Sequence, residues 1–186
     1  MKLSKRRIAL FGAAATAITM AAVNVTPVAA ANATATLTGA GSPAILSSTT
    51  PSWSQTLDGL DHSGITASAN VDVNDATGTG SGWNLTLSGA VLTSSSHTLA
   101  QPSTSAAASF TCDTSSTCTA ATSNGGTGAV SYPFTVGTTA AKFYSANASS
   151  GLGRMTGSNT WAINVPANAF AGTYTGAWVY SIVSGP

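Results

Sequence analysis

The chain has 186 residues, of which only 6% are charged, and its formal net charge is +1. Four of the six basic residues lie within residues 2–7, which leaves Lys142 and Arg154 against five aspartates and a net charge of −3 over the rest. A surface with two cations cannot neutralise a phosphate backbone or hold an anionic membrane. Composition therefore excludes nucleic acid as the main ligand and membrane binding by charge.

The first 31 residues have the pattern of a secretory signal peptide. A basic start at residues 2–7 is followed by an apolar run over residues 8–25 and by small residues, with cleavage points at about Ala30, Ala31 or Ala33. A retained membrane anchor is the alternative, and the arginine pair in the basic start is compatible with a twin-arginine signal. Because the run is short and rich in alanine and threonine, we expect cleavage, export by the general route and no membrane association afterwards.

Residues 32–186 are expected to form one folded domain. This segment is poor in charge and rich in Ser, Thr, Ala and Gly, but twelve of the thirteen aromatic residues lie in it. Disorder requires a shortage of large apolar residues, which this segment does not have. Its length suffices for a single domain with a hydrophobic core, and no tandem repeat or linker divides it.

Short segments with period-2 apolar patterns follow one another along this domain, as is typical of β-strands. The clearest runs from Ile65 to Val73, where apolar and polar residues alternate as in a strand with one buried and one solvated face. Pro133 interrupts another segment and indicates a bulge or an edge strand. Residues 141–144 fit either a strand or a turn of helix. Strands are also expected at residues 34–37, 52–57, 83–88, 110–112, 130–136, 160–165 and 173–183.

No segment beyond the apolar start shows the 3.6-residue periodicity of an amphipathic helix. Many short strands separated by Gly, Ser and Asn turns indicate an antiparallel sandwich or barrel. The predicted fold class is all-β, with a single antiparallel β-sandwich domain.

Cys112 and Cys118 are the only cysteines, in the segment Cys-Asp-Thr-Ser-Ser-Thr-Cys. In an exported protein, two thiols this close are expected to form a disulfide that stabilises the fold by about 2–3 kcal/mol. The functional alternatives are a redox pair and a metal site. A redox pair usually has two intervening residues rather than five, and no histidine accompanies these cysteines. A structural disulfide is therefore the prediction.

The segment Asp75-Ala-Thr-Gly-Thr-Gly-Ser-Gly-Trp83-Asn-Leu85-Thr86 resembles a motif of the WxL domain family of Gram-positive cell-surface proteins. In the proximal motif of that family, an Asp and a glycine-rich turn precede Trp-x-Leu. The resemblance implies a β-sandwich fold and non-covalent binding to the cell wall through recognition of peptidoglycan.

The end of the chain, Tyr174–Pro186, is similar to the distal motif of the same family. The spacing is kept, but the side chains differ: Trp178 stands in the aliphatic position, Val179 in the Thr position, Tyr180 in the Trp position and Ile182 in the Leu position. The resemblance therefore extends over residues 75–186.

The candidate binding residues are Trp83, Leu85, Trp178 and Tyr180. They occupy the motif positions, and an aromatic ring stacks well on the apolar face of a sugar. They also fit a hydrophobic core, because Trp83 is in phase with Leu85 and Leu87, and Trp178 and Tyr180 share one face of a predicted strand. Both interpretations, core and ligand surface, stay open at the level of sequence.

Residues suited to catalysis are sparse. His62 and His97 are the only histidines, no Gly-x-Ser-x-Gly elbow is present, and the chain has no Glu. The aspartates lie at turns, where hydrogen bonds to nearby backbone explain them. Oxygens of Asp72, Asn74 and Asp75 suggest a calcium loop as an alternative to turn formation, although the EF-hand pattern needs a distal Glu. We expect no enzymatic activity, no cofactor and no metal.

Together these features predict an exported, non-catalytic protein held non-covalently at a Gram-positive-type cell wall, with peptidoglycan or another wall polymer as partner. No Leu-Pro-x-Thr-Gly signal or apolar tail supports covalent sorting. The alternative is a structural subunit of a surface fibre or coat, assembled by pairing of edge strands. A small adhesin, or contacts with other surface proteins, would be compatible with the same pattern.

Overall fold

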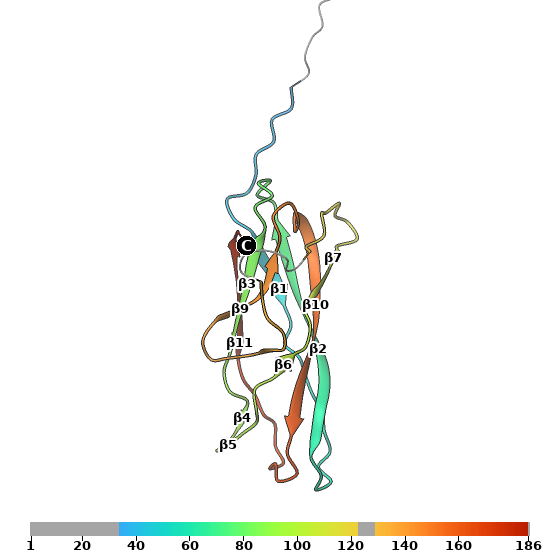
Figure 1. Cartoon of the computed structure of the whole chain (residues 1–186), viewed down its shortest axis with the longest axis vertical. Coiled ribbons are helices and arrows are strands. Elements are labelled where there is room, and N and C mark those ends of the chain that lie inside the picture. The colour runs from blue at the N-terminus through green and yellow to red at the C-terminus, as the bar shows by residue number, and fades with distance from the viewer. Residues whose placement is uncertain (1–33, 123–128, 186) are drawn as a thin grey trace, which may run out of the picture. The chain divides into compact units, whose positions relative to one another are not determined.

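The computed structural model describes residues 34–122 and 129–185 (Figure 1). The expected signal peptide, residues 1–31, lies outside the described residues and stays a prediction. All elements discussed below belong to the unit that spans residues 37–186. In the described part of the chain every regular element is a β-strand, so no helix long and apolar enough to cross a membrane is found there.

Two antiparallel sheets pack against each other and form the predicted β-sandwich. The larger sheet contains β1 (Ala44–Ser48), β2 (His62–Asp75), β6 (Ser103–Thr104), β7 (Ser109–Cys112), β8 (Phe134–Thr135) and β10 (Gly153–Val165). Its centre is the long pair β2–β10, which keeps one register from Gly153 opposite Asp75 to Ile163 opposite Ile65 and shifts before Val165 pairs with His62. β1 pairs with the outer side of β2, while β6 and β7 pair with β10, and β8 extends the sheet beyond β6.

The smaller sheet has three strands. In it β3 (Trp83–Gly89) lies between β9 (Ala141–Ala146) and β11 (Trp178–Ser184), which makes β9 and β11 its edges. A separate two-stranded hairpin is formed by β4 (Thr93–Ser94) and β5 (His97–Thr98). β11 is the last element of the chain and begins with Trp178.

The alternation of side chains along the long strands builds the interior. Val71 and Val73 of β2 are buried, and Asp72 between them is only partly buried. On β10 the inward positions include Gly157, where an added Cβ would come within 2.4 Å of the Phe110 ring. The glycine therefore makes room for an aromatic side chain from β7.

The core between the sheets is rich in aromatic rings. Trp83 of β3 meets Phe110 of β7 at a centroid distance of 5.2 Å, and Phe143 of β9 lies 6.2 Å from Trp161 of β10. Such edge-on and tilted contacts join one sheet to the other and are favourable arrangements for aromatic pairs. A second, smaller buried cluster lies beyond this core and consists of Leu92, Ile163 and Val165.

The predicted disulfide between Cys112 and Cys118 is present, with the Cα atoms 5.6 Å apart. The loop that it closes is held against β10, because the Nε atom of Arg154 lies 2.6 Å from a carboxylate oxygen of Asp113. Disulfides persist in oxidising compartments, so this bond is typical of a protein outside the cytoplasm.

Several predicted strands are confirmed. Residues 65–73 lie within β2, residues 83–88 within β3, residues 110–112 within β7 and residues 160–165 within β10. Residues 141–144 belong to β9, so the strand interpretation holds there and the helical one does not.

Other predicted strands are wrong or shorter than expected. Residues 34–37 pair with no strand, and Leu37 is 94% exposed. Residues 52–57 form no ladder either, because the Trp53 indole N–H holds that segment instead, by donating to the carbonyl of Trp161 at 3.1 Å. Of residues 130–136 only β8 is a strand, since Pro133 has no N–H to donate. The last strand starts at Trp178 rather than at residue 173, and before it only an isolated bridge to β4 forms.

Candidate functional site

Trp83 and Leu85, the predicted binding residues of the proximal motif, lie in the core with 0% of their surfaces exposed. The Trp83 indole N–H donates to the carbonyl of Gly151 at 3.0 Å, and its ring packs against Phe110 and Tyr144. A fully buried ring has no face to offer a ligand. In this structure both side chains hold the two sheets together.

Trp178 and Tyr180 of the distal motif are partly exposed. Both point to the inner face of β11: Trp178 meets Trp161 edge-on at 4.9 Å, and Tyr180 meets Phe143 at 5.8 Å. Trp178 also lines a groove at the end of the sandwich, whereas Tyr180 does not. Of the four predicted binding residues, Trp178 alone combines exposed ring surface with a place in a cavity.

The alternative calcium loop would need Asp72 and Asp75 to converge on one ion, but their carboxylates turn to opposite faces of β2. Asp72 accepts hydrogen bonds from the hydroxyls of Ser47 and Thr156, which hold its pKa below the ordinary value. Asp75 is buried and accepts from both the backbone N–H and the hydroxyl of Thr77. Both carboxylates are used locally, and no group of three potential metal ligands occurs among the described residues.

A groove of about 1200 Å³ opens at one end of the sandwich. This end lies at the bottom of Figure 1, where β10 terminates and the chain turns into β2. One wall is the segment 50–57, and the other is the segment 169–178 that leads into β11; residues 90–93 close it between them. The floor is the small buried cluster of Leu92, Ile163 and Val165. Three segments that are distant in sequence therefore form one site.

Four aromatic side chains line the groove: Trp53, Tyr174 and Trp178 are partly exposed, and Phe170 at the rim is exposed. The first three have contacts that fix their orientation. Trp53 donates to the carbonyl of Trp161, the hydroxyl of Tyr174 donates to the carbonyl of Phe170 at 3.0 Å, and Trp178 packs on the Trp161 ring. Rings held in one orientation lose little conformational entropy when a ligand covers them.

The remaining lining combines apolar side chains with polar, uncharged ones. Hydroxyls of serine and threonine and the amide of Gln55 surround the aromatic rings, and no lining residue is Asp, Glu, Lys, Arg or His. Such a surface offers apolar contact and hydrogen bonds. It lacks the fixed charge that would hold a phosphate or a carboxylate.

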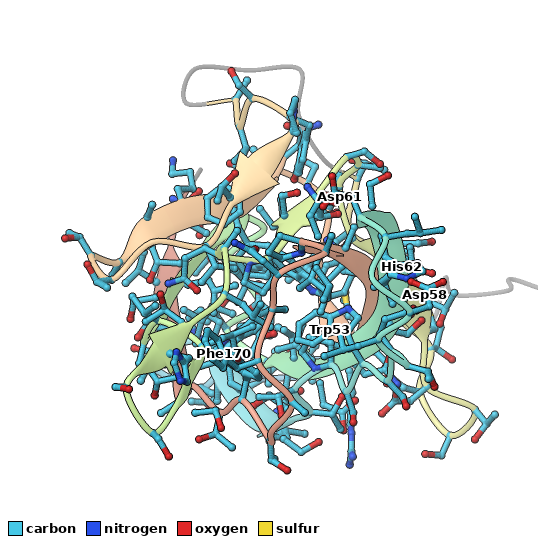
Figure 2. All side chains as sticks on the ribbon, turned by 90° about the horizontal axis from the view of Figure 1, so that it is seen from below. Trp53, Asp58, Asp61, His62 and Phe170 are labelled. Carbon is cyan, nitrogen blue, oxygen red and sulfur yellow. A yellow bond between two sulfur atoms is a disulfide. The ribbon has the colours of Figure 1, made fainter. Side chains whose placement is uncertain are left out.

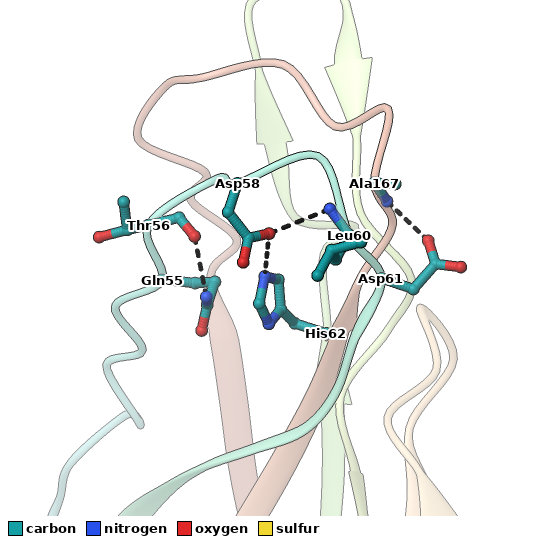
Figure 3. Close-up of polar contacts among 7 residues, drawn as sticks. All are labelled: Gln55, Thr56, Asp58, Leu60, Asp61, His62 and Ala167. Atoms are coloured by element: carbon teal, nitrogen blue, oxygen red, sulfur yellow. Dashed lines mark hydrogen bonds and ion pairs between the residues drawn. The ribbon is translucent and has the colours of Figure 1, made fainter.

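One hydrogen bond links the turn that follows the first wall to the chain just before the second wall, and local bonds hold that turn in shape (Figure 3). In the turn that follows the first wall, Asp58 accepts from the backbone N–H of Leu60 at 3.0 Å and contacts His62 at 2.8 Å, and these bonds lower its pKa. Asp61 accepts from the backbone N–H of Ala167 at 2.7 Å, just before the second wall begins. This bond joins the two chain segments that extend from the walls.

The rim on the other side carries a stacked pair of rings. His97 of the β4–β5 hairpin lies parallel to Phe170, with centroids 3.7 Å apart and an interplanar angle of 9°. Seen end-on, Trp53 lies between Phe170 and the Asp58–His62 pair (Figure 2). Both histidines are therefore engaged at the periphery of the groove, outside its lining.

The sequence pointed to only part of this site. The distal motif identifies Trp178, but the sequence predicts a strand for Trp53, because its short segment resembles one. A useful signal is present: Trp53 is flanked by Pro51, Ser52, Ser54 and Gln55, so no aliphatic or aromatic residue lies two positions away. A lone Trp among turn-forming and polar residues is typical of a loop.

Tyr180 gives a test of the inner face of β11. Burial raises its pKa from 10.0 to about 12, which means that the fold favours the neutral hydroxyl. The stability that it contributes is complete below pH 10 and is lost as the pH rises toward 12. Between pH 8 and about pH 11.5, we expect the free energy of unfolding of Tyr180→Phe to fall by roughly 1–2 kcal/mol less than that of the wild type. This range allows for the partial exposure of Tyr180. Urea midpoints at the two pH values measure this, and an equal loss in both proteins would contradict it.

The chain matches no family model, no curated protein and no solved structure. Arguments about its function therefore start from the groove and from the sequence features described above.

Proposed function

We propose that this chain is an exported, non-catalytic protein that binds a bacterial cell-wall polymer, peptidoglycan foremost, without covalent attachment. The observation that carries the proposal is the groove, in which Trp53, Tyr174 and Trp178 present fixed aromatic surface beside uncharged hydrogen-bonding groups. Concave sites with aromatic and apolar lining and a few polar groups are the usual form of ligand sites. The signal-like start and the disulfide support a location outside the cytoplasm.

The WxL-like motifs take separate roles in this proposal. Trp178 belongs to the ligand surface, whereas Trp83 and Leu85 support it from within, because β3 is the strand that pairs with β11. Tyr180 packs on Phe143 and keeps β11 against the core. A wall-binding function is also what the resemblance to that family implies, so motif and groove support the same conclusion.

Co-sedimentation with washed peptidoglycan sacculi tests this function. We expect residues 32–186 to pellet with sacculi and Ser54→Arg to remain largely in the supernatant, because Ser54 is exposed and lines the groove. An arginine there occupies space that the polymer needs. Thr56→Arg is the matched control: it adds the same side chain at an exposed position two residues away, outside the lining. Its sedimentation should equal that of the wild type.

Two results would reject the proposal. If the wild type stays in the supernatant, wall binding is absent; if both arginine variants pellet like the wild type, the groove is not the binding site. Thermal melts of both variants should match the wild-type melt, since neither side chain is buried.

A structural subunit of a surface fibre is the second candidate, and one feature favours it. β11 is an edge of the smaller sheet, and its outward residues Val179 and Val183 are 59% and 55% exposed. An exposed apolar edge strand can pair with another chain. Sedimentation velocity over a range of concentrations distinguishes the two functions, because a fibre subunit forms polymers and a wall binder stays monomeric.

A further inference from the structure

We infer that the groove binds an uncharged saccharide chain, rather than an anionic polymer or a peptide. The inference rests on the proposed function and specifies which chemical part of the wall is recognised. It follows from the charge, the chemistry and the size of the groove.

Charge excludes the two other main classes of wall component. Anionic polymers such as polyol phosphates need cations or clustered backbone N–H donors, and peptides with free carboxylates need the same. The groove lining contains no charged residue. Lys142 and Arg154, the two cations outside the predicted signal peptide, are not part of it. Arg154 is also engaged with Asp113 at 2.6 Å. Electrostatic complementarity therefore favours a neutral ligand.

The side chains present are those that suit a sugar. A pyranose ring has an apolar face of C–H groups and an edge of hydroxyls, so it needs a flat apolar surface beside donors and acceptors. Trp53 and Trp178 supply such surfaces from opposite walls, and Ser52, Thr173 and the Gln55 amide supply polar partners along the rim. The aromatic rings are held by bonds from behind, so their orientation is set before the ligand arrives.

The volume indicates a chain rather than a single sugar. Pockets for drug-sized molecules enclose about 300–1000 Å³. The groove, at about 1200 Å³, exceeds this range. Several consecutive sugar rings fill it better than one.

Titration calorimetry with defined wall fragments tests the inference. The probes are a soluble oligomer of β-1,4-linked N-acetylglucosamine, a polyol-phosphate polymer and a free stem peptide, each added to residues 32–186. We expect the oligosaccharide to bind and to change the emission of Trp53 and Trp178, and its affinity to change less than twofold between about 50 and 500 mM salt, because no ion pair forms. The polymer and the peptide should show no binding.

Variants locate the interaction. Ser54→Arg and Thr173→Arg obstruct the groove from opposite walls, and each should weaken oligosaccharide binding by about tenfold or more, equivalent to losing one stacked ring. Thr56→Arg should leave affinity unchanged. A wild type that pellets with sacculi but binds the polyol phosphate or the peptide instead of the sugar overturns this inference and leaves the proposed function standing. A wild type that neither pellets nor binds any probe overturns both.

Discussion

Replacing Trp83 with alanine is expected to lower the free energy of unfolding by about 3–5 kcal/mol. The indole is fully buried, meets Phe110 at 5.2 Å and Tyr144 at 5.6 Å, and donates to the Gly151 carbonyl. Truncation removes these contacts, leaves a cavity between the sheets and strips a buried carbonyl of its partner. Domains of this size are stable by about 5–15 kcal/mol, so the loss is a large part of the total.

Urea denaturation followed by circular dichroism measures this effect, and Trp83→Phe separates its two components. The phenylalanine keeps an aromatic ring in the core but cannot donate to Gly151, so we expect a smaller loss of about 1–3 kcal/mol. If Trp83→Ala costs less than about 1 kcal/mol, the core role is wrong. A variant that stays folded yet loses wall binding completely would restore Trp83 as a ligand residue.

The architecture could be predicted wherever apolar and polar residues alternate within a single strand. In β2 the residues from Ile65 to Val73 alternate apolar and polar without interruption, so one buried face follows from the sequence alone. The first half of β10 has no such signal. Its inward positions include Gly157 and Asn159, whose roles depend on other strands. Gly157 leaves room for the Phe110 ring, and Asn159 accepts a hydrogen bond from the Thr104 hydroxyl at 2.7 Å.

The groove was beyond sequence reasoning for a related physical reason. Its walls come from segments that are more than a hundred residues apart, and no local pattern reports that Trp53 and Trp178 line the same space. Local periodicity also cannot tell a core ring from a ligand platform, since both need an aromatic at an inward position. Burial decides between them: Trp83 is fully buried between the sheets, whereas Trp178 is partly exposed and lines the groove.

Gly82, the residue before Trp83, should be the most sensitive glycine of the motif, and Gly82→Val is expected to cost about 2–6 kcal/mol. Its φ of +73° is strained for any β-branched residue, at about 1–3 kcal/mol. An added Cβ would also lie 2.4 Å from the carbonyl oxygen of Ala146 and 2.9 Å from that of Asn147. Both atoms are backbone at the end of β9, so relief requires the β3–β9 pairing to shift, at a further cost of about 1–3 kcal/mol.

Gly78 in the same loop provides the matched control. Its φ of +71° is almost the same, but an added Cβ would meet nothing within 4 Å. Gly78→Val should therefore show the backbone strain alone, and the difference between the two urea midpoints should correspond to about 2 kcal/mol for the close approach. Equal losses would mean that conformation is all that these glycines provide. A larger loss at Gly82 means that the glycine-rich turn also allows β3 to pack closely against β9. This packing places Trp83 in the core, while the proposed ligand surface lies at the other end of the sandwich.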